Sequence, residues 1–141
     1  MICYTEHYFP STPPPYYTQH TITTQIDNTP LAVTLWDTPS HEDYDALRPM
    51  CHFHPSPNVV LCLFSVVSPS SFENVREKWF PEVEHHCPGV PVVLVGSKVD
   101  LREDVGVVEG LKAEGKGVVS YEQGVWMAQE MKAVKYLECS A

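Results

Sequence analysis

A lysine and an aspartate lie two residues apart, directly after an apolar run, in the segment Gly96-Ser97-Lys98-Val99-Asp100. A carboxylate at this place can accept hydrogen bonds from the N1–H and the exocyclic amine of guanine, while the lysine stem packs along the ring. Adenine offers a carboxylate no such pair of donors, so Asp100 would carry the specificity. By itself the pattern is weak, because a surface lysine beside a turn aspartate has the same spacing.

Two further segments strengthen this interpretation. Glu138-Cys139-Ser140-Ala141 ends another predicted strand, and its backbone N–H groups would lie near the guanine oxygen if both segments meet at one edge of a sheet. Asp37 and Thr38 follow the run Leu35-Trp36, and an aspartate at a strand end can hold Mg²⁺ through a water. An Asp-Thr pair that caps a helix is the alternative for the second segment.

The phosphate-binding half of a nucleotide site has no counterpart among the 141 residues. No G-x-x-x-x-G-K-[S/T] motif occurs in them, so the sequence offers no glycine-rich loop whose amides could hold phosphates at a helix N-terminus. The motifs therefore predict a site that can read a base but lacks the usual means of binding its phosphates.

A sheet is needed to position these segments, and the hydrophobic pattern predicts one. Apolar runs rich in β-branched residues are typical of buried strands and occur at 58–65, 90–95 and 134–139. Two more runs, 21–26 and 31–36, flank Asp27-Asn28-Thr29-Pro30 and predict a hairpin. Helical spacing between the later strands predicts β-α-β crossovers and hence a parallel sheet.

Capping patterns predict where the helices begin. Ser70 with Glu73, and Ser120 with Gln123, match the capping box, and apolar side chains follow each at helical spacing. We interpret both apolar stripes as core packing; they comprise Phe72, Val75, Trp79 and Val83 in the first helix and Gly124, Met127, Ala128 and Met131 in the second. A shorter, charged and mostly solvated helix is predicted within about 101–117.

Composition narrows the class of protein. Of the 141 residues, 43% are hydrophobic and 19% are charged, which is typical of one globular domain. The net charge of −9 provides no basic surface for nucleic acid or an anionic membrane. The five cysteines form no C-x-x-C pair, which favours reduced thiols in a cytoplasmic protein. The longest apolar run, 59–67, is too short to span a bilayer, and we expect no membrane anchor in this chain.

With these segments in order, the chain resembles a Rho-family small GTPase of the Rho/Rac type over nearly its whole length. Residues 42–49 resemble the second switch of that family, and residues 64–75 and 78–83 resemble its third helix with the approach to it. Asp100-Leu101-Arg102 and the predicted helix after it are similar to the insert that distinguishes Rho proteins from other small GTPases.

This resemblance implies a P-loop NTPase-like small G domain of the α/β class, with a mostly parallel sheet and flanking helices, spanning 1–141 as a single domain with the insert helix at about 101–117. Such a domain binds GTP or GDP with Mg²⁺ and acts as a molecular switch in signal transduction. Its partners would be exchange factors, GTPase-activating proteins and effectors.

The resemblance also assigns site residues. The expected nucleotide-binding residues are Phe9, Ser97, Lys98, Asp100, Leu101, Ser140 and Ala141, and the expected magnesium-binding residues are Asp37 and Thr38. Phe9 matches the aromatic residue that leans on the guanine edge. His41 stands where the family has the glutamine that orients the attacking water.

The chain departs from the family where phosphate is bound and hydrolysed. The resemblance places the first strand and the phosphate loop before Met1, and the last helix with the lipidated tail after Ala141, so we expect a partial domain. Pro39-Ser40-His41 replaces the family's Ala-Gly-Gln, and Pro15-Tyr16-Tyr17 replaces its Pro-Thr-Val-Phe. A histidine could still position a water, but an inert surface histidine is the more common meaning.

Two functions of different classes follow from these features. The chain is either a Rho-family GTP-binding switch whose nucleotide binding and hydrolysis are impaired, or a nucleotide-independent pseudo-GTPase module that binds Rho regulators or effectors. The replacements at Tyr16, Pro39, Ser40 and His41 favour the second, because they damage catalysis even in an otherwise complete domain. A non-functional fragment is the third alternative.

Overall fold

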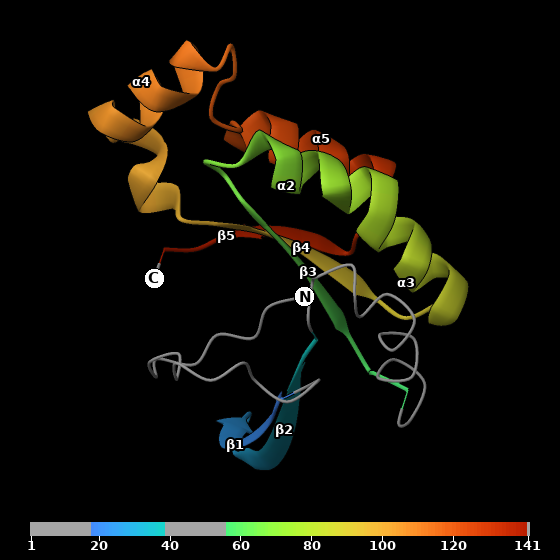
Figure 1. Ribbon diagram of the computed structural model, residues 1–141. Coiled ribbons are helices and arrows are strands. Elements are labelled where there is room, and N and C mark those ends of the chain that lie inside the picture. The colour runs from blue at the N-terminus through green and yellow to red at the C-terminus, as the bar shows by residue number, and fades with distance from the viewer. Residues whose placement is uncertain (1–17, 39–55, 141) are drawn as a thin grey trace. The chain divides into compact units, whose positions relative to one another are not determined.

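The computed structural model describes residues 18–38 and 56–140, and the chain divides into two compact units between Pro55 and Ser56. The first unit contains the strands β1 (Thr18–Ile26) and β2 (Thr29–Asp37). The second unit begins with β3 (Val60–Ser65), α2 (Pro69–Asn74), η2 (Val75–Trp79) and α3 (Phe80–His86). It continues with β4 (Val92–Ser97), η3 (Val99–Glu103), α4 (Val105–Ala113), α5 (Tyr121–Glu130) and β5 (Lys135–Glu138) (Figure 1).

The first unit contains the predicted hairpin, with a tighter turn than the pattern indicates. β1 and β2 pair antiparallel along their full length, so that Ile26 lies opposite Thr29 and only Asp27 and Asn28 form the turn. Both turn residues have positive φ, 49° and 62°, as a type I′ turn requires, and Asp and Asn tolerate this conformation better than most residues. The predicted four-residue connection 27–30 was therefore too long.

The second unit is built on a parallel sheet, as predicted. Its strands lie in the order β3-β4-β5, and both neighbouring pairs are parallel. Ser65 lies opposite Ser97 across the first pair, and Gly96 lies opposite Glu138 across the second. The carboxyl ends of all three strands therefore reach the same edge of the sheet.

The first helix of this unit begins earlier than predicted. Ser68 is its N-cap, and the Ser68 hydroxyl accepts a hydrogen bond from the backbone N–H of Ser71 at 3.4 Å. Pro69 follows at the first helical position, where its fixed φ and its lack of an N–H are both favourable. The predicted capping box of Ser70 and Glu73 was wrong, because Pro69 moves the start of the helix towards the N-terminus.

The helices α2, η2 and α3 form one continuous column with a widened π-helical turn in the middle. The backbone N–H of Phe80 donates to the carbonyl of Val75, which is the i to i+5 bond of a π-helix. Pro81 follows directly and has no N–H to donate to the turn before it. The widened turn accommodates this proline without ending the helix.

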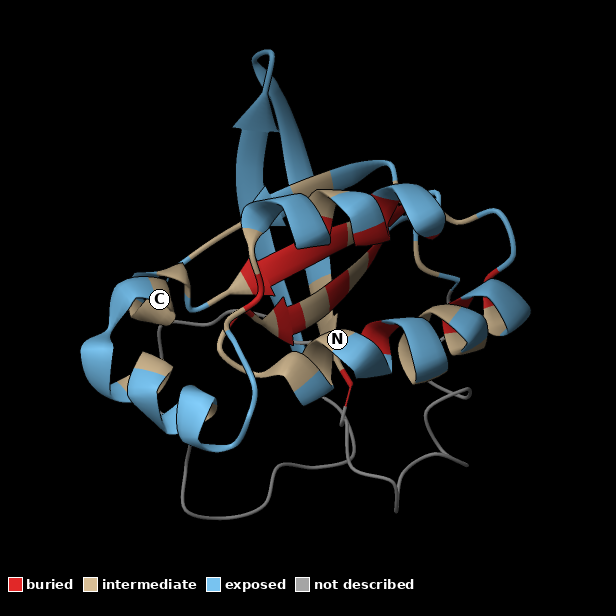
Figure 2. Cartoon of the chain, turned by 90° about the horizontal axis from the view of Figure 1, so that it is seen from above, coloured by how far each residue is buried: buried red, intermediate tan, exposed pale blue. Residues whose placement is uncertain are grey.

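The core lies between the sheet and the helices. The column from α2 to α3 and the helix α5 run over the same face of the sheet (Figure 1), and the buried residues gather on the strands beneath them (Figure 2). The core side chains come from the strands and from the predicted helical stripes: Val60, Cys62, Phe64, Val66, Val75, Val83, Leu94, Met127, Ala128 and Met131. The predicted capping box of Ser120 and Gln123 is confirmed, and it begins α5.

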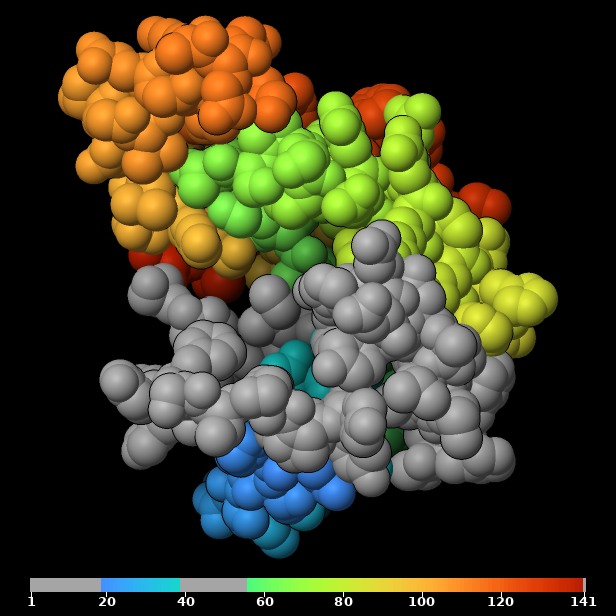
Figure 3. Space-filling view, viewed as in Figure 1, coloured from blue at the N-terminus to red at the C-terminus, as the bar shows by residue number. Residues whose placement is uncertain are grey.

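The segment between β4 and α5 contains the short helix α4, within the range where a charged helix is predicted. Asp104 is its N-cap and accepts a hydrogen bond from the backbone N–H of Val107 at 2.9 Å. None of its nine residues is buried, and it forms a separate lobe beside α2 in the space-filling view (Figure 3). Within residues 18–38 and 56–140, every helix is too short or too polar to cross a bilayer.

Two glycines make room for one aromatic ring on β5. A Cβ atom added to Gly124 in α5 would lie 2.2 Å from Cζ of Tyr136, and one added to Gly96 in β4 would lie 2.7 Å from the Tyr136 hydroxyl. Such distances are far inside van der Waals contact. The Tyr136 ring therefore fills the space between α5 and the sheet at these two glycines.

We predict that Gly124→Ala destabilises the fold by about 1 to 3 kcal/mol, because the new methyl group overlaps the Tyr136 ring. Gly110→Ala is the matched control, since Gly110 is also helical and its Cβ would meet nothing within 4 Å. The control should stabilise α4 by up to about 1 kcal/mol through helix propensity. Urea unfolding of the two variants measures both effects, and equal stabilities would contradict the packing described here.

Candidate functional site

The predicted base-reading residues lie at the carboxyl edge of the second sheet. Ser97 ends β4, Lys98 and Asp100 follow it, and Ser140 lies beyond the end of β5. Two backbone hydrogen bonds join the segments, from Cys139 N–H to the Gly96 carbonyl at 2.9 Å and from Val99 N–H to the Cys139 carbonyl at 3.4 Å. Residues about 40 positions apart in the chain are thus brought to one place.

Asp100 and Ser140 are in direct contact. The Ser140 hydroxyl donates to Oδ1 of Asp100 at 2.5 Å, and both residues are exposed. This hydrogen bond fixes the orientation of the carboxylate while leaving it accessible from solvent. An oriented, accessible carboxylate is the acceptor that recognition of the guanine N–H groups needs.

Lys98 has an unusual backbone conformation at this edge. Its φ of 62° and ψ of 39° lie in the left-handed region, which costs about 1 kcal/mol or more for a residue with a Cβ. The conformation turns the chain sharply from β4 into η3. The Lys98 side chain is exposed and forms no ion pair with a described residue, so its ammonium group is available to a ligand.

Ser97 and Leu101 form hydrogen bonds that stabilise the end of β4 and the turn after it. The Ser97 hydroxyl donates to the Phe64 carbonyl at 2.8 Å, which ties the end of β4 to β3. Leu101 is half-buried, and its N–H donates to the Lys98 carbonyl at 3.1 Å, closing the turn of η3. In this structure both residues shape the loop that carries Asp100.

An ion pair that the motifs did not predict lies beside the contact of Asp100 with Ser140. Arg102 donates from Nη1 to Oε2 of Glu138 at 2.9 Å and from Nη2 to Oε1 at 2.5 Å. Its Nε donates to the Val119 carbonyl at 3.1 Å, so one side chain joins η3, β5 and the segment before α5. The hydrogen bonds from Arg102 lower the pKa of Glu138, and those to Glu138 raise the pKa of Arg102.

Tyr136 completes this cluster. Its hydroxyl donates to Oε1 of Glu138 at 2.7 Å, the oxygen that also accepts from Arg102. Burial, together with the hydrogen bond to Glu138, raises the pKa of Tyr136, which stays protonated and acts as a donor. Tyr136 and Glu138 alternate along β5 and so share a face of the sheet. That alternation is the only signal in the sequence that could have paired them.

The magnesium candidates belong to the first unit. Asp37 is half-buried at the end of β2, and Thr38, which follows it, is 4% exposed. One carboxylate and one hydroxyl fit a Mg²⁺ ion that takes its other ligands from water and phosphate oxygens. Residues 18–38 and 56–140 contain no group of three or more acidic, histidine or cysteine side chains able to hold a metal. Phe9, His41 and Ala141 lie outside the described residues.

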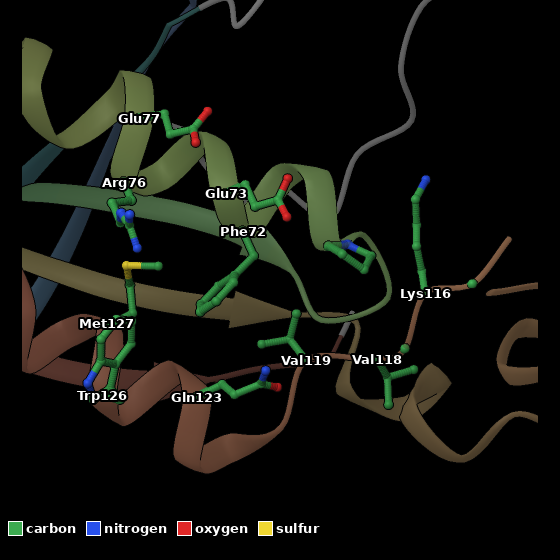
Figure 4. Close-up of a pocket in the computed structure, with 13 residues that line it drawn as sticks. Phe72, Glu73, Arg76, Glu77, Lys116, Val118, Val119, Gln123, Trp126 and Met127 are labelled. Atoms are coloured by element: carbon green, nitrogen blue, oxygen red, sulfur yellow. The ribbon is translucent and has the colours of Figure 1, made fainter. Parts of the chain in front are cut away.

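A groove of about 590 Å³ lies between the α2–η2 column, the segment 115–119 and α5. Phe72 and Met127 point into it, and Trp126 lies beside them with 53% of its surface exposed (Figure 4). Glu73, Arg76 and Glu77 belong to the same helical column as Phe72 and also line the groove, with the two carboxylates directed away from α5 (Figure 4). The groove therefore combines an apolar floor with charged side chains of both signs at its rim.

One comparison with known protein families identifies the chain. The model of the Ras family matches residues 1–141, which is the entire sequence. The match covers both compact units as well as the segments outside the described residues. A parallel sheet flanked by helices, with polar loops at its carboxyl edge, is consistent with a domain of that family.

We predict that Glu138→Gln lowers the free energy of unfolding at pH 7 by about 1 to 2 kcal/mol, because it leaves Arg102 without its carboxylate partner. Since the folded-state pKa of Glu138 is depressed, its contribution is present above the ordinary value of 4.5 and is lost as the pH falls through the depressed value. The difference between wild type and variant should therefore be constant from pH 7 to 5 and shrink in stronger acid.

Urea unfolding at pH 7, 5 and 3.5 measures this dependence. Glu114→Gln is the control, because the pair of Glu114 with Lys116 is more than half exposed on average and such pairs are worth less than about 1 kcal/mol. A Glu138→Gln variant as stable as the wild type at pH 7 would show that the ion pair does not stabilise the fold.

Proposed function

Because the chain belongs to the Ras family, we propose that it is a GTP-binding switch protein of the Rho type whose nucleotide binding and hydrolysis are impaired. Membership of the family makes it a small GTPase-like, GTP-binding protein with Mg²⁺ as the usual companion of the nucleotide. The observation that carries base recognition is the contact of Ser140 with Asp100 at the edge of the sheet. In this proposal, the hydrogen bond from Ser140 orients the carboxylate for the N–H groups of guanine.

The Rho-type assignment is supported by the segment between β4 and α5. η3 contains Asp100-Leu101-Arg102, and α4 follows it as an additional helix before α5. We propose that residues 1–141 form one small G domain with α4 as the Rho-type insert. Its partners would then be exchange factors, GTPase-activating proteins and effectors of Rho proteins.

A cytoplasmic location accords with this proposal. Burial raises the pKa of the Cys62 thiol to about 11, so this cysteine stays protonated and unreactive near neutral pH. Cys62 and Cys139 are free thiols, which is typical of a protein in a reducing compartment.

The proposed impairment rests on residues that occupy phosphate positions of the family. Ser40 stands for the glycine that meets the γ-phosphate, and His41 stands for the glutamine that orients the attacking water. Tyr16 lies in the segment that resembles the first switch. Charge-assisted contacts to phosphate are worth about 1.5 to 3 kcal/mol each, so each contact that is lost lowers affinity by about tenfold or more.

The first experiment is a thermal melt of the 141-residue chain with millimolar nucleotide and Mg²⁺. We expect GTP to raise the melting temperature and ATP to leave it unchanged, because only guanine presents two donors to Asp100. Asp100→Ala should abolish the response to GTP. Phosphate release from GTP should stay at the buffer rate.

Glu103→Ala is the matched control for this experiment, since Glu103 is an exposed acid in the same turn. It should leave the response to GTP intact. An equal response to GTP and ATP, or a response that survives Asp100→Ala, would contradict base recognition at this edge. GTP-dependent phosphate release above the buffer rate would contradict the proposed loss of hydrolysis.

The second candidate function is a nucleotide-independent module that binds Rho regulators or effectors. The groove between the α2–η2 column and α5 favours it, because Trp126 is half-exposed there over an apolar floor. Exposed tryptophans are over-represented among the residues that dominate binding at protein interfaces. Glu73, Arg76 and Glu77 form no ion pair among the described residues and could meet charges on a partner.

This candidate predicts that Trp126→Ala weakens binding to the catalytic domain of a Rho exchange factor by at least about tenfold, in a buffer without nucleotide. Tyr121→Ala is the control, since Tyr121 is an equally exposed aromatic residue on α5 that does not line the groove. Surface plasmon resonance measures both. Binding that requires GTP, or that ignores the Trp126 substitution, would favour the switch instead.

A further inference from the structure

We propose that Tyr136 is a positioning residue for the base-reading edge, acting through Glu138 and Arg102 on the loop that carries Asp100. What the edge binds rests on the function proposed above. The positioning itself concerns contacts within the chain and is measured without any nucleotide.

The Tyr136 hydroxyl sets the orientation of the Glu138 carboxylate. Oε1 accepts from Tyr136 at 2.7 Å and from Arg102 at 2.5 Å, while Oε2 accepts from Arg102 alone at 2.9 Å. Two long, flexible side chains pair weakly unless something restricts them, because ordering both costs conformational entropy. The phenol provides that restriction from a third side chain.

The phenol can do this because its ring is itself confined. Gly124 and Gly96 leave space that any side chain would fill, with the added Cβ atoms 2.2 Å from Cζ and 2.7 Å from the hydroxyl of Tyr136. The ring of Phe64 stacks parallel to the Tyr136 ring, with 6.3 Å between the ring centroids, and the centroid of the Tyr121 ring lies 5.4 Å from that of Tyr136. With the ring surrounded in this way, the hydroxyl has a fixed position on β5.

The cluster and the base-reading contact are parallel links between the same two segments. Arg102 and Glu138 form one link, and Asp100 and Ser140 form the other, each partner being two residues from its counterpart. The backbone bond from Val99 N–H to the Cys139 carbonyl joins the same segments. Arg102 also donates to the Val119 carbonyl at 3.1 Å, so the same side chain ties η3 both to β5 and to the segment before α5.

The exposed Asp100 depends on this cluster more than its own contact suggests. Its link to Ser140 is a single hydrogen bond between two exposed residues, and water competes with such a bond. The link of Arg102 to Glu138 is bidentate, charge-assisted and less than one quarter exposed on either side chain. The pair of Arg102 with Glu138 therefore holds the two segments in register. The hydrogen bond between Ser140 and Asp100 can form because that register is kept.

Tyr136→Phe tests the proposal, because it removes the hydroxyl and keeps the ring that fills the core. Tyr121→Phe is the matched control, since the Tyr121 hydroxyl makes no hydrogen bond with a described residue. By hydrogen exchange of the nucleotide-free chain, we expect the Cys139 amide to exchange about tenfold faster in Tyr136→Phe. Amides that pair β3 with β4 should exchange at the wild-type rate in Tyr136→Phe. The control Tyr121→Phe should have the melting temperature of the wild type.

Titration of the Glu138 carboxyl by NMR gives a readout that loss of packing would not move. The pKa of Glu138 should rise in Tyr136→Phe, since the phenol donates to the charged form, and should stay in place in Tyr121→Phe. If the Cys139 exchange rate and the pKa of Glu138 both match the wild type in Tyr136→Phe, the proposal is overturned.

The affinity for GDP, compared with that for ADP, tests whether the cluster of Tyr136, Glu138 and Arg102 affects binding at the base-reading edge. Tyr136→Phe should weaken GDP binding by about tenfold, and this effect should vanish in a Glu138→Gln background, because the phenol acts through that carboxylate. An effect of equal size in both backgrounds would overturn the proposal in favour of simple packing. A wild-type chain that binds no GDP would overturn the proposed function, and the exchange and titration results would still decide the role of Tyr136.

Discussion

The parallel register of β4 with β5 is the constraint on which the second unit depends. With Gly96 opposite Glu138, both strands end at the same level, and the loops that follow them must meet. Asp100 contacts Ser140, and Arg102 contacts Glu138, only because the two strands end side by side. A slip of one residue would turn Tyr136 and Glu138 to the other face of the sheet and separate both pairs at once. The register of the strands thus decides which side chains meet at this edge.

The secondary structure could be predicted well where the signal is local. The apolar runs at Val60–Ser65 and Val92–Ser97, and the capping box of Ser120 with Gln123, depend on neighbouring residues alone and lie close to their predicted places. Errors arose where two local signals competed. Ser70 and Glu73 matched the capping pattern, but Pro69 fitted the first helical turn better, and the helix began at Ser68 instead. The widened turn before Pro81 has the same origin, since a proline in a helix must be accommodated somewhere.

The site was predictable only in part, for a physical reason. Lys98, Asp100 and Ser140 lie in short motifs whose chemistry can be recognised in one segment, and the structure brings the last two together. Arg102 and Tyr136 act through contacts that exist only after the sheet has formed, between residues 36 positions apart in the case of Arg102 and Glu138. Nothing in the segment around Arg102 distinguishes it from a surface arginine. Long-range pairs of this kind become visible through register and burial, which a linear pattern does not contain.

The space that Gly96 and Gly124 leave for Tyr136 has a consequence for how this sequence can change over time. A larger residue at either glycine demands a smaller one on β5, and a smaller one there forfeits the hydroxyl that Glu138 accepts from. Three positions on two strands and a helix are therefore coupled, and single substitutions among them are harmful even though paired substitutions could be neutral. We therefore expect few substitutions at these three positions in descendants of this sequence. The residues of α4, none of which is buried, can be substituted more freely.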